Sequence, residues 1–411
     1  MDNPIEKVFN RIDTYGNRVI DLQTRMTAIP AMGPENGGDG ELEKSDYIKT
    51  VLEQMKCDEL IVLEAPDKRV SSGKRPNLLA RFKGESSRRT LWIMSHMDVV
   101  PPGDIGLWET DPFTMVEKDG KLYGRGTEDD QQGIVSSLLT VQALQEENCI
   151  PACDIGLAIV ADEEAGSKYG IEYVLKKRPD LFRPDDLIII PDAGDEKGAM
   201  IEVAEKSILW FKCVVQGKQT HGSTPEKGIN AHNAAAHLIV RLKSLYAAFP
   251  KSDALFDPPI STFEPTKRDA NVDNINTIPG TDTFYFDCRI LPDYPLETVK
   301  RRILDLAGEI ESEFSVTISL TYPQCEEAPP PTPADTPAAE ALKKAVREVS
   351  GVSAYTIGIG GGTVAAYFRK AGLPAVCWCK LDDTLHAPNE YCRVANVLHD
   401  AKVFAHIALQ R

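Results

Sequence analysis

Short apolar runs recur through the first half of the chain, and a polar or acidic residue follows each run directly. The clearest runs are 91–94, 157–161 and 187–190. Stretches with helical character separate them, which is typical of a mostly parallel sheet that is buried on both faces. The pattern therefore predicts an α/β fold in which helices cover both faces of the sheet.

After residue 208 the pattern changes to that of a smaller domain. The sequence alternates over Lys212–Gln216, and the elements expected to follow are a helix at 230–245, a strand at 283–290, a helix at 296–314 and a strand at 315–320. This β-α-β order predicts a small α/β sandwich inserted in the main domain. The proline-rich stretch 328–333 is expected to lead back to the main domain as a stiff spacer before a helix near 338–350. We assign 1–207 and 322–411 to the main domain and 208–321 to the insert.

Five residues that could bind metal ions follow predicted strands or lie in acidic motifs. They are His96, Asp129, Glu164, Asp192 and His386. Open α/β sheets place their ligand crevice at the carboxyl ends of the strands. One such aspartate is usually a helix cap or a turn residue, but five in one sheet are not explained that way. Carboxylates that converge there would repel one another unless a cation neutralised them.

The number of these residues exceeds the ligands of one tetrahedral ion. The set therefore fits two ions that share a bridging carboxylate and lie roughly 3.5–4 Å apart, with Glu163 left free. Two histidines and several carboxylates suit zinc first, and also manganese or cobalt. On this interpretation the main domain is the catalytic domain.

These motifs, in this order, resemble those of the co-catalytic metallopeptidase family that includes glutamate carboxypeptidase, succinyl-diaminopimelate desuccinylase, aminoacylase and the cytosolic dipeptidases. The resemblance covers nearly the whole chain. It implies that Asp129, in the Gly-Arg-Gly-x-x-Asp motif, bridges two ions. His96 and Asp192 would bind the first ion, and Glu164 and His386 the second.

The resemblance also assigns roles to residues that do not bind metal. Asp98 of the His-x-Asp motif would orient the first histidine, and Glu163 would be the general base. The Asp129–Asp130 peptide bond is expected to be cis. The chain departs from many relatives at Gln131 and Gln132, where a lysine-containing segment is common, and this departure weakens any transfer of their substrates.

A third group of residues would bind the substrate. The resemblance implies that the insert is a lid and dimerisation domain, that its His221 reaches a neighbouring subunit's active site, and that Asn276 and Arg289 hold a substrate carboxylate. The planar guanidinium of arginine suits a carboxylate, although an ordinary salt bridge to Asp287 or Asp293 is the alternative.

The glycine-rich turn 358–363 precedes a helix near 364–370, and such a turn can bind an anion through its backbone N–H groups. Within it Gly361, Gly362 and Thr363 are the substrate candidates. A nucleotide-binding protein could use such a turn for phosphate. The chain, however, lacks the Gly-x-x-x-x-Gly-Lys-Ser/Thr motif and a Gly-x-Gly-x-x-Gly segment that opens a first βαβ unit.

Composition limits the classes of protein that remain. With 411 residues and 42% hydrophobic residues, the chain can form two domains. A net charge of −16 argues against a nucleic-acid partner. No apolar stretch of about 18 residues is present to span a membrane, and the start of the chain lacks signal-peptide features. Nine scattered cysteines indicate free thiols in a reducing compartment, so we expect a cytoplasmic protein.

Together these features predict a two-metal hydrolase that cleaves a peptide or N-acyl amide bond next to a free carboxylate, in a homodimer. The alternatives are an N-acyl amino acid deacylase or desuccinylase and a non-catalytic scaffold relative. A scaffold would be expected to lack ligands or the base, and the chain retains all of them.

Overall fold

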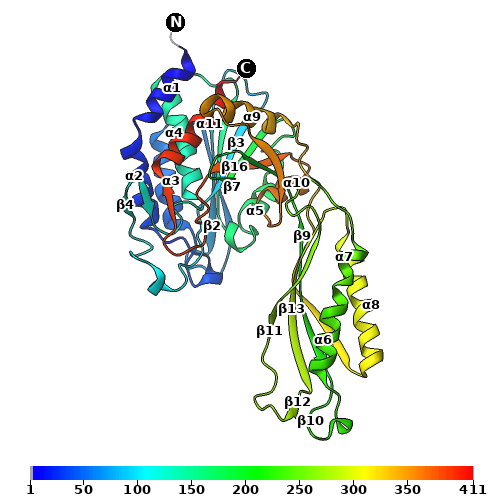
Figure 1. Ribbon diagram of the computed structural model, residues 1–411. Coiled ribbons are helices and arrows are strands. Elements are labelled where there is room, and N and C mark those ends of the chain that lie inside the picture. The colour runs from blue at the N-terminus through cyan, green and yellow to red at the C-terminus, as the bar shows by residue number, and fades with distance from the viewer. Residues whose placement is uncertain (1–2, 411) are drawn as a thin grey trace. The chain divides into compact units, whose positions relative to one another are not determined.

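The computed structural model describes residues 3–410, which form two compact units (Figure 1). The first unit contains the chain up to Val203, Thr332–Thr356 and the chain from Thr363 onward. The second contains Ala204–Pro331 and Ile357–Gly362.

An eight-stranded sheet forms the centre of the first unit. Its order is β1-β2-β6-β3-β7-β16-β8-β15, and the last two strands run past the boundary of the unit. The strands are β1 Glu59–Pro66, β2 Lys74–Phe82, β3 Thr90–His96, β6 Asp154–Val160, β7 Leu187–Asp195, β8 Met200–Glu205, β15 Tyr355–Ile359 and β16 Ala375–Lys380. The four central strands are parallel, while β1 and β2 pair antiparallel. The expected α/β fold with a mostly parallel sheet is confirmed.

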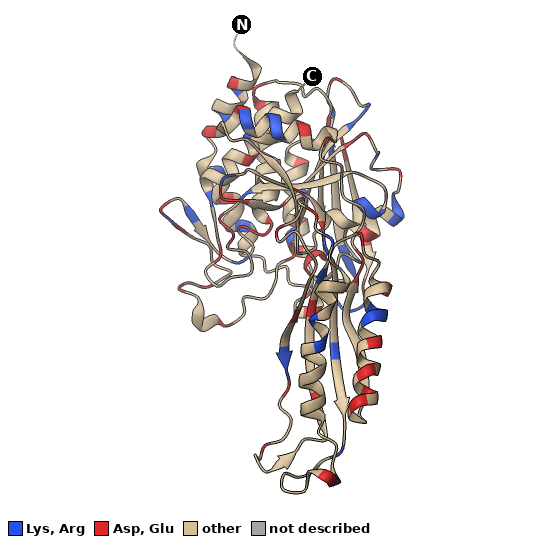
Figure 2. Cartoon of the chain, turned by 45° about the vertical axis from the view of Figure 1, so that its right-hand side comes forward, with Lys and Arg blue, Asp and Glu red and all other residues tan. Residues whose placement is uncertain are grey.

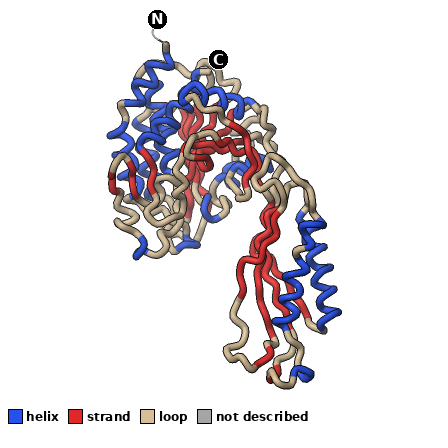
Figure 3. Tube along the Cα trace, viewed as in Figure 1, coloured by secondary structure: helices blue, strands red, loops and turns tan. Residues whose placement is uncertain are grey.

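Helices flank this sheet on both sides (Figure 3). They are α1 Pro4–Asp13, α2 Gly16–Thr27, α3 Leu42–Gln54, α4 Gln131–Glu146, α5 Ile171–Lys177, α9 Pro337–Ser350, α10 Ala365–Lys370 and α11 Val394–Leu409. Apolar residues of α5 and α10 share one core with the sheet, which includes the buried Trp92, Ile188 and Phe368. A small three-stranded sheet joins β4 Val116–Lys118, β5 Lys121–Tyr123 and β17 Tyr391–Arg393. The sequences of the central strands are continuously apolar because these strands are buried on both faces.

The second unit is an antiparallel sheet with helices on one face. Its strand order is β11-β13-β9-β14, with β9 Ser207–Gln216, β11 Thr262–Arg268, β13 Thr281–Ile290 and β14 Thr317–Glu326. Alternate residues of β9 and β13 are buried against α6 Ala231–Leu242 and α8 Leu296–Phe314. The short helix α7 Ser244–Ala248 follows α6, and β10 Thr220–His221 pairs with β12 Thr277–Ile278.

Besides the short stretch 204–207, two segments expected in the main domain belong to the second unit, namely 322–331 and 357–362. The first does so because β14 continues to Glu326, where it still pairs with Ile208 at the start of β9. The second is held by Leu255, whose carbonyl oxygen accepts a hydrogen bond from the N–H of Gly358 at 2.7 Å.

Acidic and basic residues are interspersed on the helices of both units (Figure 2). Helix α8 shows why, because its buried positions are all apolar or alanine and its charged residues occupy the remaining faces. Among residues 3–410, no helix is long and apolar enough to cross a membrane.

Candidate metal centre

The strands that carry three of the predicted ligands are neighbours in the sheet of the first unit. His96 is the last residue of β3, Asp192 lies in β7, and Glu164 lies in a 3-10 turn just after β6. These strands are parallel and adjacent, so their carboxyl ends meet at one edge of the sheet. Asp129 and His386 come from loops that precede α4 and β17.

The other four predicted ligands gather around Asp129. Its Oδ1 lies 2.8 Å from Nε2 of His96, and its Oδ2 lies 3.1 Å from Nε2 of His386. Oε2 of Glu164 is 3.2 Å from the same nitrogen of His386, and Oδ1 of Asp192 is 3.8 Å from Nε2 of His96. The two oxygens of one carboxylate therefore face two different histidines, and each histidine has a second carboxylate beside it.

The residues at this position fit divalent cations. Ligand atoms of His96, Glu163 and Asp192 lie within 4.8 Å of one another, as do those of His96, Asp129 and Glu164. Within the described residues, Oε1 of Glu164 is buried and has no hydrogen-bond partner. A buried carboxylate oxygen without a partner is costly, but it is a suitable ligand for a cation. The imidazole and carboxylate donors match zinc, manganese or cobalt.

The acidic groups of the centre are withdrawn from water. Burial raises the pKa of Glu164 to about 7, and repulsion from Asp129 contributes to the shift. Burial, with repulsion from Asp192, also raises the pKa of Glu163 well above its ordinary value. Hydrogen bonds to Asp129 and Glu164 raise the pKa of His386 to about 10. Bound cations would relieve this concentration of negative charge.

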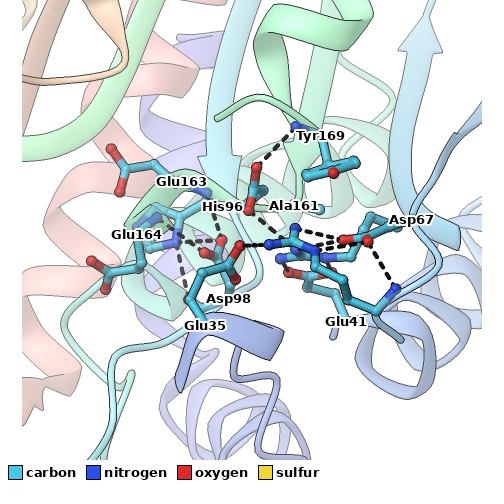
Figure 4. A network of polar contacts seen from close by, with 12 residues as sticks. Glu35, Glu41, Asp67, His96, Asp98, Ala161, Glu163, Glu164 and Tyr169 are labelled. Atoms are coloured by element: carbon cyan, nitrogen blue, oxygen red, sulfur yellow. Dashed lines mark hydrogen bonds and ion pairs between the residues drawn. The ribbon is translucent and has the colours of Figure 1, made fainter. Parts of the chain in front are cut away.

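Asp98 holds the turn that carries both glutamates (Figure 4). Its carboxylate accepts hydrogen bonds from the backbone N–H groups of Glu163 and Glu164, each at 3.0 Å. Nδ1 of His96 donates to the backbone carbonyl oxygen of Asp98 at 3.0 Å, whereas the nearest carboxylate oxygen of Asp98 is 3.5 Å away. The main chain of Asp98 thus orients the histidine more closely than its side chain does, and Nε2 is left facing Asp129.

The segment after Asp129 packs beneath the centre. The Asp129–Asp130 peptide bond is cis, as the resemblance implied. The carboxylate of Asp130 accepts hydrogen bonds from the N–H groups of His96 and Gly133. Gln131 accepts from the hydroxyl of Thr27 at 3.0 Å. Gln131 and Gln132 are both buried, so these two residues, which stand where many members of the family that the chain resembles have a lysine-containing segment, pack in the interior.

Gln132 connects this segment to the neighbouring strand and helix. Its Nε2 donates to the carbonyl oxygen of Lys380 at 2.7 Å and to Oδ2 of Asp400 at 2.9 Å. The buried Asp400 also accepts from the N–H of Lys380. The side chain of Gln132 is therefore committed to structural hydrogen bonds.

Two predicted substrate residues meet at β10 and β12 of the second unit. His221 pairs with Thr277 in the strand register, and the N–H of Gly222 donates to the carbonyl oxygen of Asn276 at 2.6 Å. His221 is exposed, and its Nδ1 lies 2.7 Å from the hydroxyl of Ser223. His221 and Asn276 therefore lie near each other and form a first cluster of predicted substrate residues.

Arg289 and the glycine-rich segment form a second cluster in the same unit. Arg289 is the next-to-last residue of β13, at the end away from β12. It donates from Nε and Nη2 to the carboxylate of Asp287 at 2.7 and 3.0 Å, and from Nη1 to the carbonyl oxygen of Gly360 at 2.9 Å. The salt bridge to Asp287 is thus formed. Gly361 and Gly362 continue this segment, which ends at the unit boundary.

Thr363 is the first residue after that segment and belongs to the first unit. Its hydroxyl accepts a hydrogen bond from the N–H of Ala365 at 3.3 Å, at the start of α10, and lies 3.4 Å from the thiol sulfur of Cys377. In the first unit Thr363 therefore has a local structural role in addition to the substrate contact expected of it.

Sequence reasoning missed a buried arginine behind the glutamate turn. Arg75 is fully buried; it donates from Nε to Glu41 at 2.6 Å and from Nη1 to Oδ1 of Asp162 at 3.1 Å. Oδ2 of Asp162 accepts from the N–H of Tyr169 at 2.9 Å (Figure 4). Asp162 immediately precedes Glu163 and has a positive φ of 64°. No local pattern marks Arg75, because Glu41 and Asp162, to which it donates, are distant in the sequence.

Glu128 and Glu390 are two further buried acidic residues, and the sequence alone did not predict a function for them. Glu128 precedes the bridging aspartate, and Glu390 closes the motif of His386. Acidic residues are rarely buried unless they are paired. Their positions close to Asp129 and His386 in the sequence could have indicated a role near the metal centre. Their burial, however, becomes apparent only in the folded chain.

Comparisons with known proteins bear on this centre. The sequence model described as "Peptidase family M20/M25/M40" matches residues 92–410. The chain is 40% identical over 413 residues to an uncharacterized metallohydrolase of Methanococcus maripaludis, covering 95% of this chain and 98% of the relative. It is 27% identical over 391 residues to a succinyl-diaminopimelate desuccinylase of Nautilia profundicola, with coverage of 95% and 98%.

A solved structure, aminopeptidase PepT from Bacillus cereus, has a similar fold. The TM-score is 0.74 with 20% sequence identity, and the alignment covers 96% of this chain and 98% of that one. This likeness concerns the fold.

Proposed function

Because the chain belongs to the M20/M25/M40 peptidase family, we propose that it is a two-metal hydrolase that cleaves a peptide or N-acyl amide bond next to a free carboxylate. The position of Asp129, whose oxygens face His96 and His386, carries the proposal. His96 and Asp192 would hold one ion, Glu164 and His386 the other, and Asp129 both. Zinc is the first choice, with manganese or cobalt as alternatives.

Glu163 is the general base in this proposal. When bound, two divalent ions supply Lewis acidity, which polarises a carbonyl group and makes water more acidic. Glu163 takes a proton from the water that attacks the carbonyl carbon and passes it to the leaving nitrogen, so that a C–O bond forms and the C–N bond breaks. The N–H groups of Glu163 and Glu164 donate to the carboxylate of Asp98. These bonds fix the turn that presents Glu163 as the base and Glu164 as a ligand.

The substrate carries a free carboxylate, which we assign to Arg289, Gly361, Gly362 and Thr363. The guanidinium of Arg289 is partly exposed and already aligned by Asp287, which supports such a role. Two substrate classes meet this requirement, namely peptides and N-acyl amino acids. The first class would make the protein a peptidase. The alternative is a deacylase that acts on N-acyl amino acids, and the similarity to a protein named succinyl-diaminopimelate desuccinylase supports that alternative.

A hydrolysis panel tests the proposed function. Protein stripped with a chelator is reloaded with zinc, manganese or cobalt and offered dipeptides, tripeptides and N-acetyl or N-succinyl amino acids. We expect turnover of one class by the reloaded protein and none by the stripped protein. Amidated or esterified versions of the best substrate are the matched control, because they lack the carboxylate. Absence of turnover by fully loaded protein would favour the non-catalytic scaffold.

We further propose a homodimer in which His221 of the partner subunit completes each active site. Mixing two inactive variants, His221→Ala and Glu163→Gln, tests this arrangement. In a mixed dimer one site has both residues, so random exchange of subunits should restore about one quarter of the wild-type activity. A mixture as inactive as its components, after exchange is confirmed by native mass spectrometry, would contradict action across the interface.

A further inference from the structure

The loop that carries His386 and the turn that carries Asp129 must be held together by contacts distant in the sequence. His386 lies in 381–390, between β16 and β17, where the chain forms no helix or strand. Glu128, beside Asp129, contacts this loop at Asp382 across 254 residues of chain. The distance between the two ligands is therefore set by whatever joins the two segments.

Glu390 reaches from the loop into the turn. Its Oε1 accepts hydrogen bonds from the N–H groups of Glu128 at 3.0 Å and Asp129 at 3.1 Å. Its Oε2 accepts from the N–H of Gly126 at 3.0 Å and from Nη1 of Arg125 at 2.6 Å. The side chain of Glu390 is fully buried, so these donors have no competing water.

Glu128 reaches in the opposite direction, from the turn into the loop. Its carboxylate accepts hydrogen bonds from the N–H of Asp382 at 2.7 Å and from the N–H and the hydroxyl of Thr384, the latter at 2.7 Å. Nη2 of Arg125 donates to the carbonyl oxygen of His386 at 3.2 Å, which adds a direct link to the ligand itself. We call Arg125, Glu128 and Glu390 the loop brace.

Apart from the shared Asp129, the ligands of the other ion do not contact the loop brace. His96 and Asp192 belong to the adjacent parallel strands β3 and β7, whose backbones are joined by the ladder of the central sheet. The side chain of His386, by contrast, is 56% exposed and belongs to an irregular loop. Loosening the brace should therefore affect the two halves of the centre unequally.

We propose that Glu128 and Glu390 are positioning residues that set the affinity for the ion held by Glu164 and His386 far more strongly than that for the ion held by His96 and Asp192, with which they share only Asp129. The inference rests on the proposed two-metal function. Glutamate is required at 128 because all its partners donate hydrogen bonds, and a carboxylate accepts on both oxygens. In glutamine one oxygen becomes an NH₂ group that cannot accept from them.

Zinc titration of the stripped full-length protein, in competition with a chromophoric chelator, tests the proposal. The wild type is expected to bind two ions per chain in separable steps. Glu128→Gln should weaken one step by about 10–100-fold, the usual effect of removing a group that orients a ligand. The other step should stay within about twofold, since strand ligands remain in place. Excess zinc should restore activity. Glu109→Gln, at an exposed glutamate, is the matched control.

Equal weakening of both steps, or no weakening, would overturn the proposal. Thr384→Val is the second variant. It removes the hydroxyl, which bonds to Glu128 and to the main chain of Tyr391, but keeps the N–H bonds of Asp382 and Thr384 to Glu128, so it should give a smaller loss in the same step. If Glu128→Gln does not fold, the zinc titration of Thr384→Val tests the proposal instead. A wild type that binds no zinc, or one ion, would instead overturn the proposed two-metal function, whatever the variants do.

Discussion

A Glu163→Gln variant is expected to lose about 10²–10⁴-fold in kcat, the share that general acid–base catalysis usually supplies. Glutamine keeps the size and shape of the side chain but cannot accept a proton at neutral pH. The backbone N–H of residue 163 still donates to Asp98, so the turn and the ligand Glu164 should stay in place. Two measurements check this: kcat on the best substrate of the panel, and the number of ions bound per chain.

The control for this variant is Glu172→Gln, which makes the same chemical change at an exposed position in α5. It should leave both kcat and metal content unchanged. If Glu163→Gln retained wild-type turnover, the base would have to be another group. If it lost its ions together with its activity, Glu163 would act as a ligand, which its place beside His96 and Asp192 also allows chemically.

The parts of the fold that sequence could predict are those with a strong local signal. The helix expected at 296–314 matches α8 residue for residue, because its apolar period is regular, Pro295 precedes it and Ser315 ends it with a positive φ of 55°. The helix expected at 230–245 is instead divided at Lys243 into α6 and α7. The apolar period continues through this point, so it does not reveal the break.

The candidate ligands could be proposed because each follows an apolar run or lies within a motif. Their convergence is a property of the sheet, in which β6, β3 and β7 are neighbours although they are not consecutive in the chain. The assignment of 357–362 to the second unit had no such signal, since it depends on contacts with Leu255 and Arg289. Glu41 and Asp162, which pair with Arg75, are likewise distant from it in the sequence.

An Arg75→Leu variant is expected to lose about 3–5 kcal/mol of unfolding free energy, the usual result of removing one partner of a buried ion pair. The guanidinium is fully buried and pairs with the buried Glu41 and Asp162. Leucine would fill part of the volume but would leave both carboxylates without a counter-charge. The measurement is denaturant unfolding of the full chain, followed by far-ultraviolet circular dichroism and tryptophan fluorescence.

Two controls separate burial from charge in this experiment. Arg81 lies on the same strand, β2, and pairs with Glu59, but both side chains are about two-fifths exposed, so Arg81→Leu should cost about 1 kcal/mol or less. Replacing Glu41 by leucine in the Arg75→Leu background should recover part of the loss, because it removes one of the uncompensated charges. An Arg75→Leu variant as stable as Arg81→Leu would contradict the role given to this buried network.

The same variant should also lower kcat in the fraction that folds. Arg75 and the N–H of Tyr169 hold the two carboxylate oxygens of Asp162, the residue just before Glu163. Without the guanidinium, one oxygen of Asp162 loses its partner, and the turn that presents Glu163 and Glu164 becomes less constrained. A misplacement of about 1 Å is enough to cost roughly 10²-fold in rate. Activity per folded molecule should therefore fall in Arg75→Leu and stay unchanged in Arg81→Leu, which connects the stability of this network to the chemistry beside it.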